Sequence, residues 1–374
     1  MSVQLTKLRV FQFRNFPHEQ IHFSSGTNLL FGTNGQGKTN LLEAVYFLGY
    51  GKSFRTPTPR DCILHGAGEC RIEGTISGGN LERDLAVLIS TKGKKLQVRG
   101  KDAAIEDFIG NLHLLAFTSG HLEIVRGAPA QRRAFLDRGM VTIYPAHVRQ
   151  LASYGRALKQ RNRLLTAARD SGVSPDEPLL ESWEETLIND GARIMANRMS
   201  YVARMKETLP AGVFGSEILK LRYISKVRTE QADAAVLTGQ LRQSMHQARE
   251  SDVRSGFTSI GPHRDELKLF VNGKSLADFG SAGQQRSALL SMYFAQMEIH
   301  REAHGFYPLF LVDDAEAELD EQRMKTFLSY LTDRTQTILT TSKAALIPEL
   351  NAEMRRYEVR DGAVHTTAPI EPGR

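Results

Sequence analysis

A glycine-rich stretch at residues 32–39, Gly-Thr-Asn-Gly-Gln-Gly-Lys-Thr, contains residue types that hold a nucleoside triphosphate, and it satisfies G-x-x-x-x-G-K-[ST]. Glycines let the backbone curl so that N–H groups point at phosphate oxygens, and the following helix presents its positive end to the same anion. The motif predicts that Lys38 contacts the β- and γ-phosphates and that the Thr39 hydroxyl holds Mg²⁺. The predicted ATP-binding residues are Gly32, Thr33, Asn34, Gly35, Gln36, Gly37, Lys38, Thr39 and Asn40.

Two adjacent carboxylates near the C-terminus could complete this site. Residues 308–312 (PLFLV) form a short apolar run typical of a buried parallel strand, and Asp313 and Asp314 follow it directly. A carboxylate there can bind Mg²⁺, and its neighbour can orient or deprotonate an attacking water. A solvated acidic loop is the alternative, because six acidic residues fall between positions 311 and 321. The upstream phosphate loop favours the first interpretation, with Lys38, Asp313 and Asp314 as catalytic residues and Thr39 and Asp313 as metal ligands.

The elements that must position these groups can be read from hydrophobic periodicity. Residues 27–31 predict a buried strand before the loop, and residues 41–48 predict a helix after it, with Gly49 as a natural stop. Further strands are expected at residues 4–10, 20–24, 69–77, 84–90 and 95–99. Helix formers dominate from about 127 to 248, with a possible strand at 218–224. Strand character then returns in a hairpin turned at Asn272–Gly273.

This order predicts an α/β fold with a helical insertion. We expect a split head, formed by residues 1–105 and 255–374, and a mainly helical lid subdomain of residues 106–254.

A third motif, Phe-Gly-Ser-Ala-Gly-Gln-Gln-Arg, occupies residues 279–286 and opens a helical pattern at 287–300. Small and polar residues at a helix N-terminus make a second anion site. The order of phosphate loop, S-x-G-Q-Q, apolar strand with paired acids and then Glu318-Leu319-Asp320 resembles the heads of ABC-type ATPases.

That resemblance implies a head-to-tail dimer with two ATP molecules at its interface. Ser281 and Gly283 would face the γ-phosphate bound by a second subunit, with Gln284 and Arg286 supporting their loop. Asp320 would lie in a loop that crosses the interface.

Within this class the chain resembles the RecF family across nearly its whole length. The residues that carry the likeness are LRVFQFRNF at 8–16, GKSFRT at 51–56, QRRAFLD at 131–137 and GPHRD at 261–265. The long coiled-coil arm of SMC and Rad50 relatives is excluded, because the helical stretch breaks at Pro175 and Pro178 and has no sustained heptad.

The RecF resemblance implies ATP-dependent homodimerisation, sequence-non-specific binding to gapped or junction DNA, and weak, DNA-stimulated ATP hydrolysis that resets the dimer. It also implies work with RecR and RecO in loading RecA at single-strand gaps, with links to replication and the SOS response. Arg14 would be an additional phosphate contact.

Three positions depart from the family pattern. The stretch 118–122 reads Thr-Ser-Gly-His-Leu where Pro-Glu-Asp usually precedes the leucine, Ala282 replaces a common glutamine, and Ala317 replaces the usual serine. These changes predict weaker coupling within the subunit and across the dimer. None removes a phosphate- or metal-binding group, so hydrolysis is expected to survive.

Charge along the chain points to a DNA surface. The whole chain has a net charge of +6, whereas residues 131–169 hold nine basic groups and one acidic group, a net +8. A solvated helical face is the alternative, but arginine forks suit phosphate oxygens, and positions 149, 156 and 163 share one helix face. The predicted DNA contacts are Arg132, Arg133, Arg149, Arg156, Lys159 and Arg163.

Composition limits the remaining function classes. With 41% hydrophobic and 24% charged residues the chain is typical of a globular protein, and no apolar run approaches a membrane span, so a cytoplasmic location is expected. Its two cysteines form neither a zinc nor a disulfide pattern, and its eleven histidines show no H-E-x-x-H or comparable metal spacing. Two alternatives stay open: an ABC-type ATPase that gates a complex without DNA, and a small-molecule P-loop kinase. The kinase leaves S-x-G-Q-Q and the basic stretch unexplained.

Overall fold

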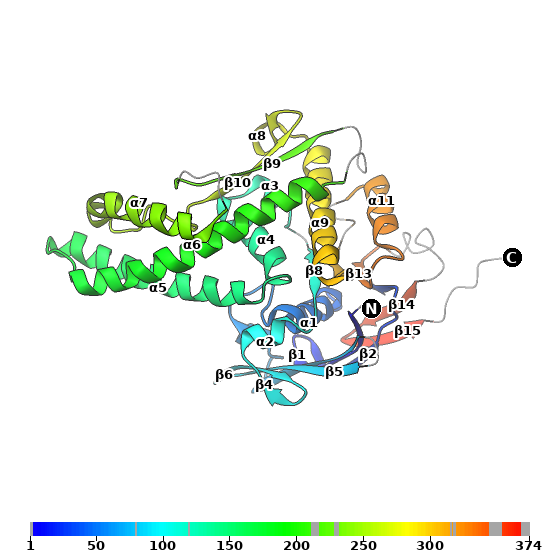
Figure 1. Cartoon of the computed structure of the whole chain (residues 1–374). Coiled ribbons are helices and arrows are strands. Elements are labelled where there is room, and N and C mark those ends of the chain that lie inside the picture. Colours follow the sequence, from blue (N-terminus) through cyan, green and yellow to red (C-terminus); the bar gives the residue numbers. More distant parts are fainter. Residues whose placement is uncertain are drawn as a thin grey trace. The chain divides into compact units, whose positions relative to one another are not determined.

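The computed structural model describes residues 3–78, 81–118, 120–210, 217–227, 232–314, 316, 319–343 and 354–367 (Figure 1). These residues form two compact units. The first unit comprises the described residues of 3–122 and 289–367, and the second those of 123–288.

This division differs from the expected split head at two places, each for a reason of strand pairing. Residues 106–122 join the first unit because β8 (Leu114–Phe117) pairs in parallel with β12 (Leu309–Val312). Residues 255–288 join the second unit because β10 (Glu266–Val271) pairs with β9 (Leu219–Ile224). Neither pairing is visible in local periodicity, since the partners lie more than 40 residues apart in the sequence.

A mixed six-stranded sheet in the first unit positions the phosphate loop. Its strand order is β15-β14-β3-β13-β12-β8, and only the β14–β15 hairpin is antiparallel. Its remaining members are β3 (Thr27–Phe31), β13 (Thr337–Thr341), β14 (Arg355–Arg360) and β15 (Ala363–Thr367). The predicted strand at 27–31 and the predicted run at 308–312 are therefore confirmed, with β13 between them. Their carboxyl ends meet at one edge of the sheet, where open parallel sheets bind ligands.

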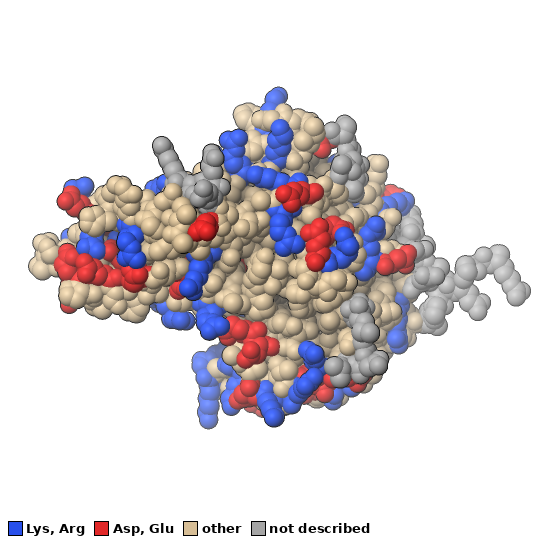
Figure 2. Space-filling view, in the orientation of Figure 1, with Lys and Arg blue, Asp and Glu red and all other residues tan. Residues whose placement is uncertain are grey.

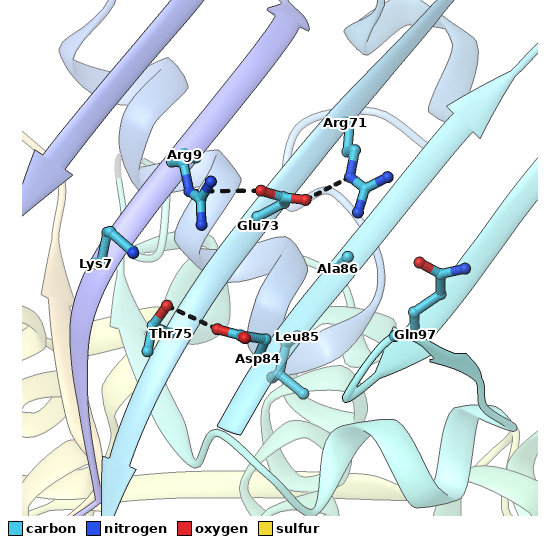
Figure 3. Close-up of a pocket in the computed structure, with 10 residues that line it drawn as sticks. Lys7, Arg9, Arg71, Glu73, Thr75, Asp84, Leu85, Ala86 and Gln97 are labelled. Atoms are coloured by element: carbon cyan, nitrogen blue, oxygen red, sulfur yellow. Dashed lines mark hydrogen bonds and ion pairs between the residues drawn. The ribbon is translucent and has the colours of Figure 1, made fainter. Parts of the chain in front are cut away.

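A second sheet of the first unit is antiparallel, with the order β2-β1-β4-β5-β6-β7. Its strands are β1 (Val3–Phe13), β2 (Phe16–His22), β4 (Glu69–Gly78), β5 (Leu81–Ser90), β6 (Gly93–Val98) and β7 (Lys101–Asp102). Figure 3 shows a small hollow on its polar face. There Glu73 lies between Arg9 and Arg71, and Thr75 donates to Asp84 across the β4–β5 pair. Cross-strand pairs of this kind support the sheet.

Helix α1 (Lys38–Tyr50) packs between the two sheets, against β4 on one side and β13 on the other. Gly49 does not end it, contrary to the sequence prediction. A glycine is required at position 49 because a β-carbon there would collide with the Leu114 side chain. The helix is instead capped by Gly51, which has φ +63°. The other helices of this unit are η1 (Pro59–Cys62), α2 (Ile105–Ile109), α11 (Glu321–Leu331) and most of α9 (Ala282–His304).

The second unit is mainly helical, as expected. Its helices α5 (Ala146–Ser171), α6 (Glu177–Thr208) and α7 (Ala234–Ser255) pack on one another around Leu187, Met195 and Leu241 (Figure 1). The shorter helices are α3 (Glu123–Arg126), α4 (Pro129–Val141) and α8 (Leu276–Phe279). The predicted hairpin is present as β10 and β11 (Lys274–Ser275), with Val271 opposite Lys274. Among the described helices of both units, none is long and apolar enough to span a membrane.

Candidate nucleotide site

The loop between β3 and α1 has the curled backbone that the motif predicts. Gly32, Gly35 and Gly37 have φ angles of +150°, +84° and +112°. Residues other than glycine rarely adopt such angles. A β-carbon at Gly37 would also come within 2.8 Å of the Asn15 and Phe16 side chains. Gly37 is the N-cap of α1 and brings no side chain to the first N–H groups of the helix. These groups are therefore suited to an anion.

Lys38 is buried at the first position of α1, and its ammonium group faces the loop. Its Nζ donates to the carbonyl oxygens of Gly32 at 2.7 Å and Thr33 at 2.9 Å. Burial lowers the pKa of Lys38, and the nearby carboxylates of Asp314, Glu316 and Asp313 partly offset that effect. A buried cation held by neutral carbonyls is ready to exchange them for phosphate oxygens.

Asp313, which follows β12, is hydrogen-bonded to Thr39 of α1. Its Oδ1 accepts from the Thr39 hydroxyl at 2.9 Å and from the Thr340 hydroxyl at 2.9 Å. The Asp313 side chain is buried, and this burial raises its pKa. The hydroxyl of Thr39 and the carboxylate of Asp313 are hard oxygen donors, the type that Mg²⁺ prefers. The donor set therefore fits the metal that the phosphate loop implies.

Asp314 lies beside a third carboxylate that sequence reasoning did not assign to the site. Its backbone has φ +48°, and its N–H donates to the Thr340 hydroxyl at 2.9 Å. Burial and then the neighbouring Glu316 raise the pKa of Asp314. Burial also acts on Glu316, but hydrogen bonds from the Thr341 hydroxyl and the Ser342 N–H outweigh it and lower the pKa of Glu316. The pair therefore holds a negative charge preferentially on Glu316.

Arg14 is engaged with a carboxylate of α1. Its Nε and Nη2 donate to the two oxygens of Glu43 at 2.8 and 2.7 Å, and its Nη1 donates to the Asp61 carbonyl at 2.8 Å. Three of its five N–H donors are thus used inside the protein. The predicted phosphate contact would have to come from the remaining two.

Two asparagines also brace the loop. The sequence predicts a role for Asn40 but not for Asn15, because the partners of Asn15 lie more than 20 residues away. Asn15 donates to the Gln36 carbonyl at 3.0 Å and accepts from Asn40 at 2.7 Å. Asn40 in turn accepts from Arg55 at 2.7 Å. The RNF stretch at residues 14–16 is the sequence signal that could have indicated this role.

The S-x-G-Q residues form the start of α9. Ser281 N–H donates to the Gln284 side chain at 2.8 Å, and Gln284 N–H lies 3.2 Å from the Ser281 hydroxyl, a reciprocal capping box. Gln285 is buried, and its amide is held by the Leu276 and Gly280 carbonyls and by Arg126. Ser281 itself is exposed. Gln284 and Gln285 therefore fix the conformation in which Ser281 is presented.

Ser119, which belongs to the first departure, and Ala317, which is the third, lie outside the described residues. Glu318 also lies outside them. The described part of the first departure contains a polar contact that the sequence did not predict. The His121 ring stacks on Tyr293 of α9, and its Nδ1 is hydrogen-bonded to the Tyr293 hydroxyl at 2.6 Å. The N–H and the hydroxyl of Thr118 contact the two nitrogens of the His121 ring at 3.2 and 3.1 Å. A histidine thus couples the end of β8 to α9 where the family usually has acidic residues. Asp320 caps α11 by accepting from Arg323 N–H at 2.9 Å.

Comparisons with known proteins agree with this geometry. The family model described as the RecF/RecN/SMC N-terminal domain matches residues 4–365. A protein of Myxococcus xanthus named DNA replication and repair protein RecF is 35% identical over 380 residues. The alignment covers 99% of this chain and 99% of the relative. A Bacillus subtilis protein of the same name is 30% identical over 367 residues, which is 96% of this chain and 99% of the relative. The chain belongs to the RecF family.

Solved structures give the same result. A structure of the recombination mediator protein RecF-ATPrS in the RecFOR pathway superposes with a TM-score of 0.89 at 28% identity, covering 98% of both chains. An Smc head domain from Pyrococcus furiosus has a TM-score of 0.55 at 15% identity, over 98% of this chain and 96% of that one. The second likeness shows the fold alone. The predicted fold class, an ABC-type ATPase head with mixed sheets and an inserted helical part, is confirmed.

For this RecF-family chain, one predicted DNA contact, Arg132, needs correction, and a second, Arg133, is partly engaged inside the protein. Arg132 is buried, pairs with both oxygens of Glu266 at 2.7 and 3.0 Å, and donates to the Gly127 carbonyl at 2.8 Å. Arg133 is partly buried and donates to the Asp265 carbonyl at 2.7 Å. These arginines connect α4 to β10 and its preceding turn, so Arg132 cannot reach DNA without breaking the unit. The sequence could not reveal this, because the partners lie about 130 residues away.

The other four candidates lie exposed on α5: Arg149, Arg156, Lys159 and Arg163. A shallow groove along this helix is lined by Lys159 and Arg163, together with Gly155, Asn162 and Thr166. In contrast, Arg161 on the opposite face is fully buried against Glu184 and Asp252, so it does not add to the surface charge. Figure 2 shows basic and acidic side chains interspersed on the visible face of the helical unit.

Proposed function

We propose that this chain is an ATP-switched DNA-binding protein of recombinational repair and replication. One observation carries the proposal: a complete phosphate-loop site, with Thr39 joined to Asp313, in a chain that aligns end to end with proteins named RecF. ATP is the proposed nucleotide, in keeping with solved structures described as RecF-ATP and RecF-ATPrS. DNA-stimulated, slow hydrolysis would act as a switch.

In this proposal the residues of the loop divide the work of binding. Lys38 leaves the carbonyls of Gly32 and Thr33 for β- and γ-phosphate oxygens, and the N–H groups at the start of α1 bind the same oxygens. Thr39 and Asp313 would hold Mg²⁺, which when bound would supply positive charge to the phosphates. Asp314 orients the attacking water and accepts its proton.

The second half of the site would come from another copy of the chain. Ser281 is exposed at the start of α9 and held by Gln284, as a group that meets an external phosphate requires. The neighbouring Phe279 is 73% exposed, so an interface at this place would bury apolar surface. An ATP-dependent homodimer would cover Phe279 and bring Ser281 and Gly283 to the partner subunit's nucleotide.

DNA is proposed to contact α5 through Arg149, Arg156, Lys159 and Arg163. Contacts with phosphates alone would make the affinity independent of sequence and strongly dependent on salt. Gapped or junction DNA is the proposed substrate. RecR is the proposed direct partner, with RecO and RecA in the same process, SOS induction as a consequence, and the cytoplasm as the location.

Size-exclusion chromatography with and without ATP, beside a DNA mobility-shift assay, tests this proposal against its alternatives. We expect an ATP-dependent monomer–dimer change together with DNA binding, and we expect Phe279→Ser to keep the protein monomeric while nucleotide binding is unchanged. Dimerisation without DNA binding would favour an ABC-type ATPase that gates a complex without DNA. Neither effect would favour a small-molecule kinase.

A further inference from the structure

Three histidines of the first unit converge away from the phosphate loop, at the opposite edge of the mixed sheet. His113 immediately precedes β8, whereas His300 and His304 lie on the last turns of α9, shortly before β12. One ring nitrogen from each lies within 4.8 Å of the others. Sequence reasoning did not indicate a metal site among the histidines, but His300 and His304 are four residues apart on one helix face. The third member is 187 positions away from His300.

Backbone carbonyls lie beside two rings of this cluster. His300 Nδ1 lies 2.9 Å from the Phe306 carbonyl, and His113 Nε2 lies 3.2 Å from the Gly110 carbonyl. In the tautomers that donate to both carbonyls, each of these nitrogens carries the proton of its neutral ring. The other two nitrogens, His113 Nδ1 and His300 Nε2, then face each other with lone pairs at 2.8 Å.

In these tautomers the two facing lone pairs can bind one cation, whereas in the other tautomer of His113 its Nδ1–H donates to His300 Nε2. An extra proton would create a charged imidazolium at His300, which is only 1% exposed, and burial disfavours that form. A metal ion takes neutral imidazole nitrogens directly. The carbonyls of Phe306 and Gly110 then act as the outer partners that orient metal-binding histidines in proteins.

We propose that His113, His300 and His304 form a zinc site that fastens the end of α9 to the edge of the sheet. Zinc–nitrogen distances of about 2.0–2.1 Å in a tetrahedral site place two ligand nitrogens about 3.3 Å apart, so the His113–His300 pair opens by about 0.5 Å. The exposed ring of His304 supplies the third ligand, and water supplies the fourth. The site lies at the C-terminal end of α9, where the helix dipole also favours a cation.

The position of the site gives it a mechanical role. The same helix begins with the Ser281 capping box and ends at these histidines. A metal here therefore fixes the far end of the helix that presents the S-x-G-Q residues. Zinc is proposed as a structural ion and takes no part in hydrolysis.

Titration calorimetry of the full-length protein with Zn²⁺, without nucleotide or Mg²⁺, tests the site. We expect one zinc per chain, a rise in melting temperature with zinc, and tetrahedral d–d absorption when Co²⁺ is used instead. The exposed variant His304→Gln should weaken zinc binding by more than about tenfold, and His113→Asn should do the same. His246→Gln, an exposed histidine of α7, is the matched control and should leave binding unchanged.

Three results would overturn the proposal. The first is a wild-type protein that binds no stoichiometric zinc. The second is equal zinc affinity in His304→Gln and His246→Gln, and the third is an octahedral Co²⁺ spectrum. None depends on ATP or DNA binding, so the site can fail without affecting the proposed function.

Discussion

At the scale of single residues, the two carboxylates that follow β12 have different partners and therefore different roles. Asp313 accepts from Thr39 and Thr340 and is placed to hold Mg²⁺. Asp314 has a left-handed backbone, an uncommon conformation outside glycine that is found disproportionately at functional sites. Its carboxylate interacts with that of Glu316. Water activation is its expected role.

Replacement of Asp314 tests this separation. Asp314→Asn keeps the shape of the side chain but removes the group that accepts a proton, so we expect kcat to fall about 100-fold. Nucleotide affinity should stay within about twofold, because Lys38, Thr39 and Asp313 are untouched. Single-turnover hydrolysis and fluorescent-nucleotide binding measure the two quantities. Unchanged hydrolysis, in a protein that still binds ATP, would exclude Asp314 as the base.

His263 predicts how stability depends on pH. Its Nε2 donates to the Thr258 carbonyl and its Nδ1 accepts from the Tyr154 hydroxyl, so the ring is held neutral. Burial lowers its pKa to about 4, and the charges of Arg264 and Arg133 act in the same direction. Between pH 4 and the ordinary value of about 6.5, the unfolded state binds the additional proton. The free energy of unfolding must therefore fall as pH falls through this interval.

Chemical denaturation across this pH range, with His263→Gln for comparison, measures the effect. We expect the wild type to lose up to about 3 kcal/mol more than the variant between pH 6.5 and 4. Parallel curves for the two proteins would show that His263 is not held neutral.

At the scale of elements, α5 has one face for stability and another that is open to a ligand. Arg161 is fully buried and donates to Glu184 at 3.0 and 2.8 Å and to Asp252 at 2.8 Å. It therefore connects α5 with both α6 and α7. Arg156 and Arg163, five residues before and two residues after it, are exposed. A count of arginines along the sequence cannot separate these roles.

Removal of Arg161 should destabilise the helical unit. Arg161→Ala leaves the buried carboxylate of Asp252 without its cation and leaves Glu184 with Arg249 alone, and the loss of a buried cation costs about 3–5 kcal/mol. The exposed control Arg156→Ala should change stability by less than about 0.5 kcal/mol. Urea unfolding monitored by circular dichroism gives both values. Equal stability of the two variants would contradict the buried network.

Charge reversal on the exposed face tests the DNA surface. Arg156→Glu combined with Arg163→Glu should weaken DNA binding and flatten its salt dependence, because two phosphate contacts are lost. Lys92→Glu with Lys101→Glu, on exposed positions of the first unit, is the matched control. If both double variants bind DNA alike, the basic face of α5 is only a solvated surface.

The contrast between local sequence patterns and contacts with distant residues explains which parts of the structure could be predicted. The strand at 27–31, the phosphate loop and the strand before Asp313 are local patterns, and the structure has them as predicted. Strand pairs that set the domain boundaries, the burial of Arg132 and Arg161, and the meeting of His113 with His300 depend on partners far away in the sequence. Single-residue patterns carry no information about such partners.

At the scale of the whole molecule, the central claim is that ATP controls DNA binding. The nucleotide site belongs to the first unit, whereas the exposed arginines of α5 belong to the second. Helix α9 belongs to both units: its first residues lie in the second unit and its remaining residues in the first. Nucleotide binding is therefore expected to influence DNA affinity through α9 and the proposed dimer interface beside Phe279.

The most direct test is the affinity for duplex, single-stranded and gapped DNA, measured with ATP for the wild type and for Lys38→Met. The account predicts that ATP strengthens wild-type binding to gapped DNA and that Lys38→Met abolishes this gain, whereas the exposed control Lys101→Met retains it. DNA affinity that is the same with and without ATP in the wild type, or an ATP effect that survives in Lys38→Met, would contradict it.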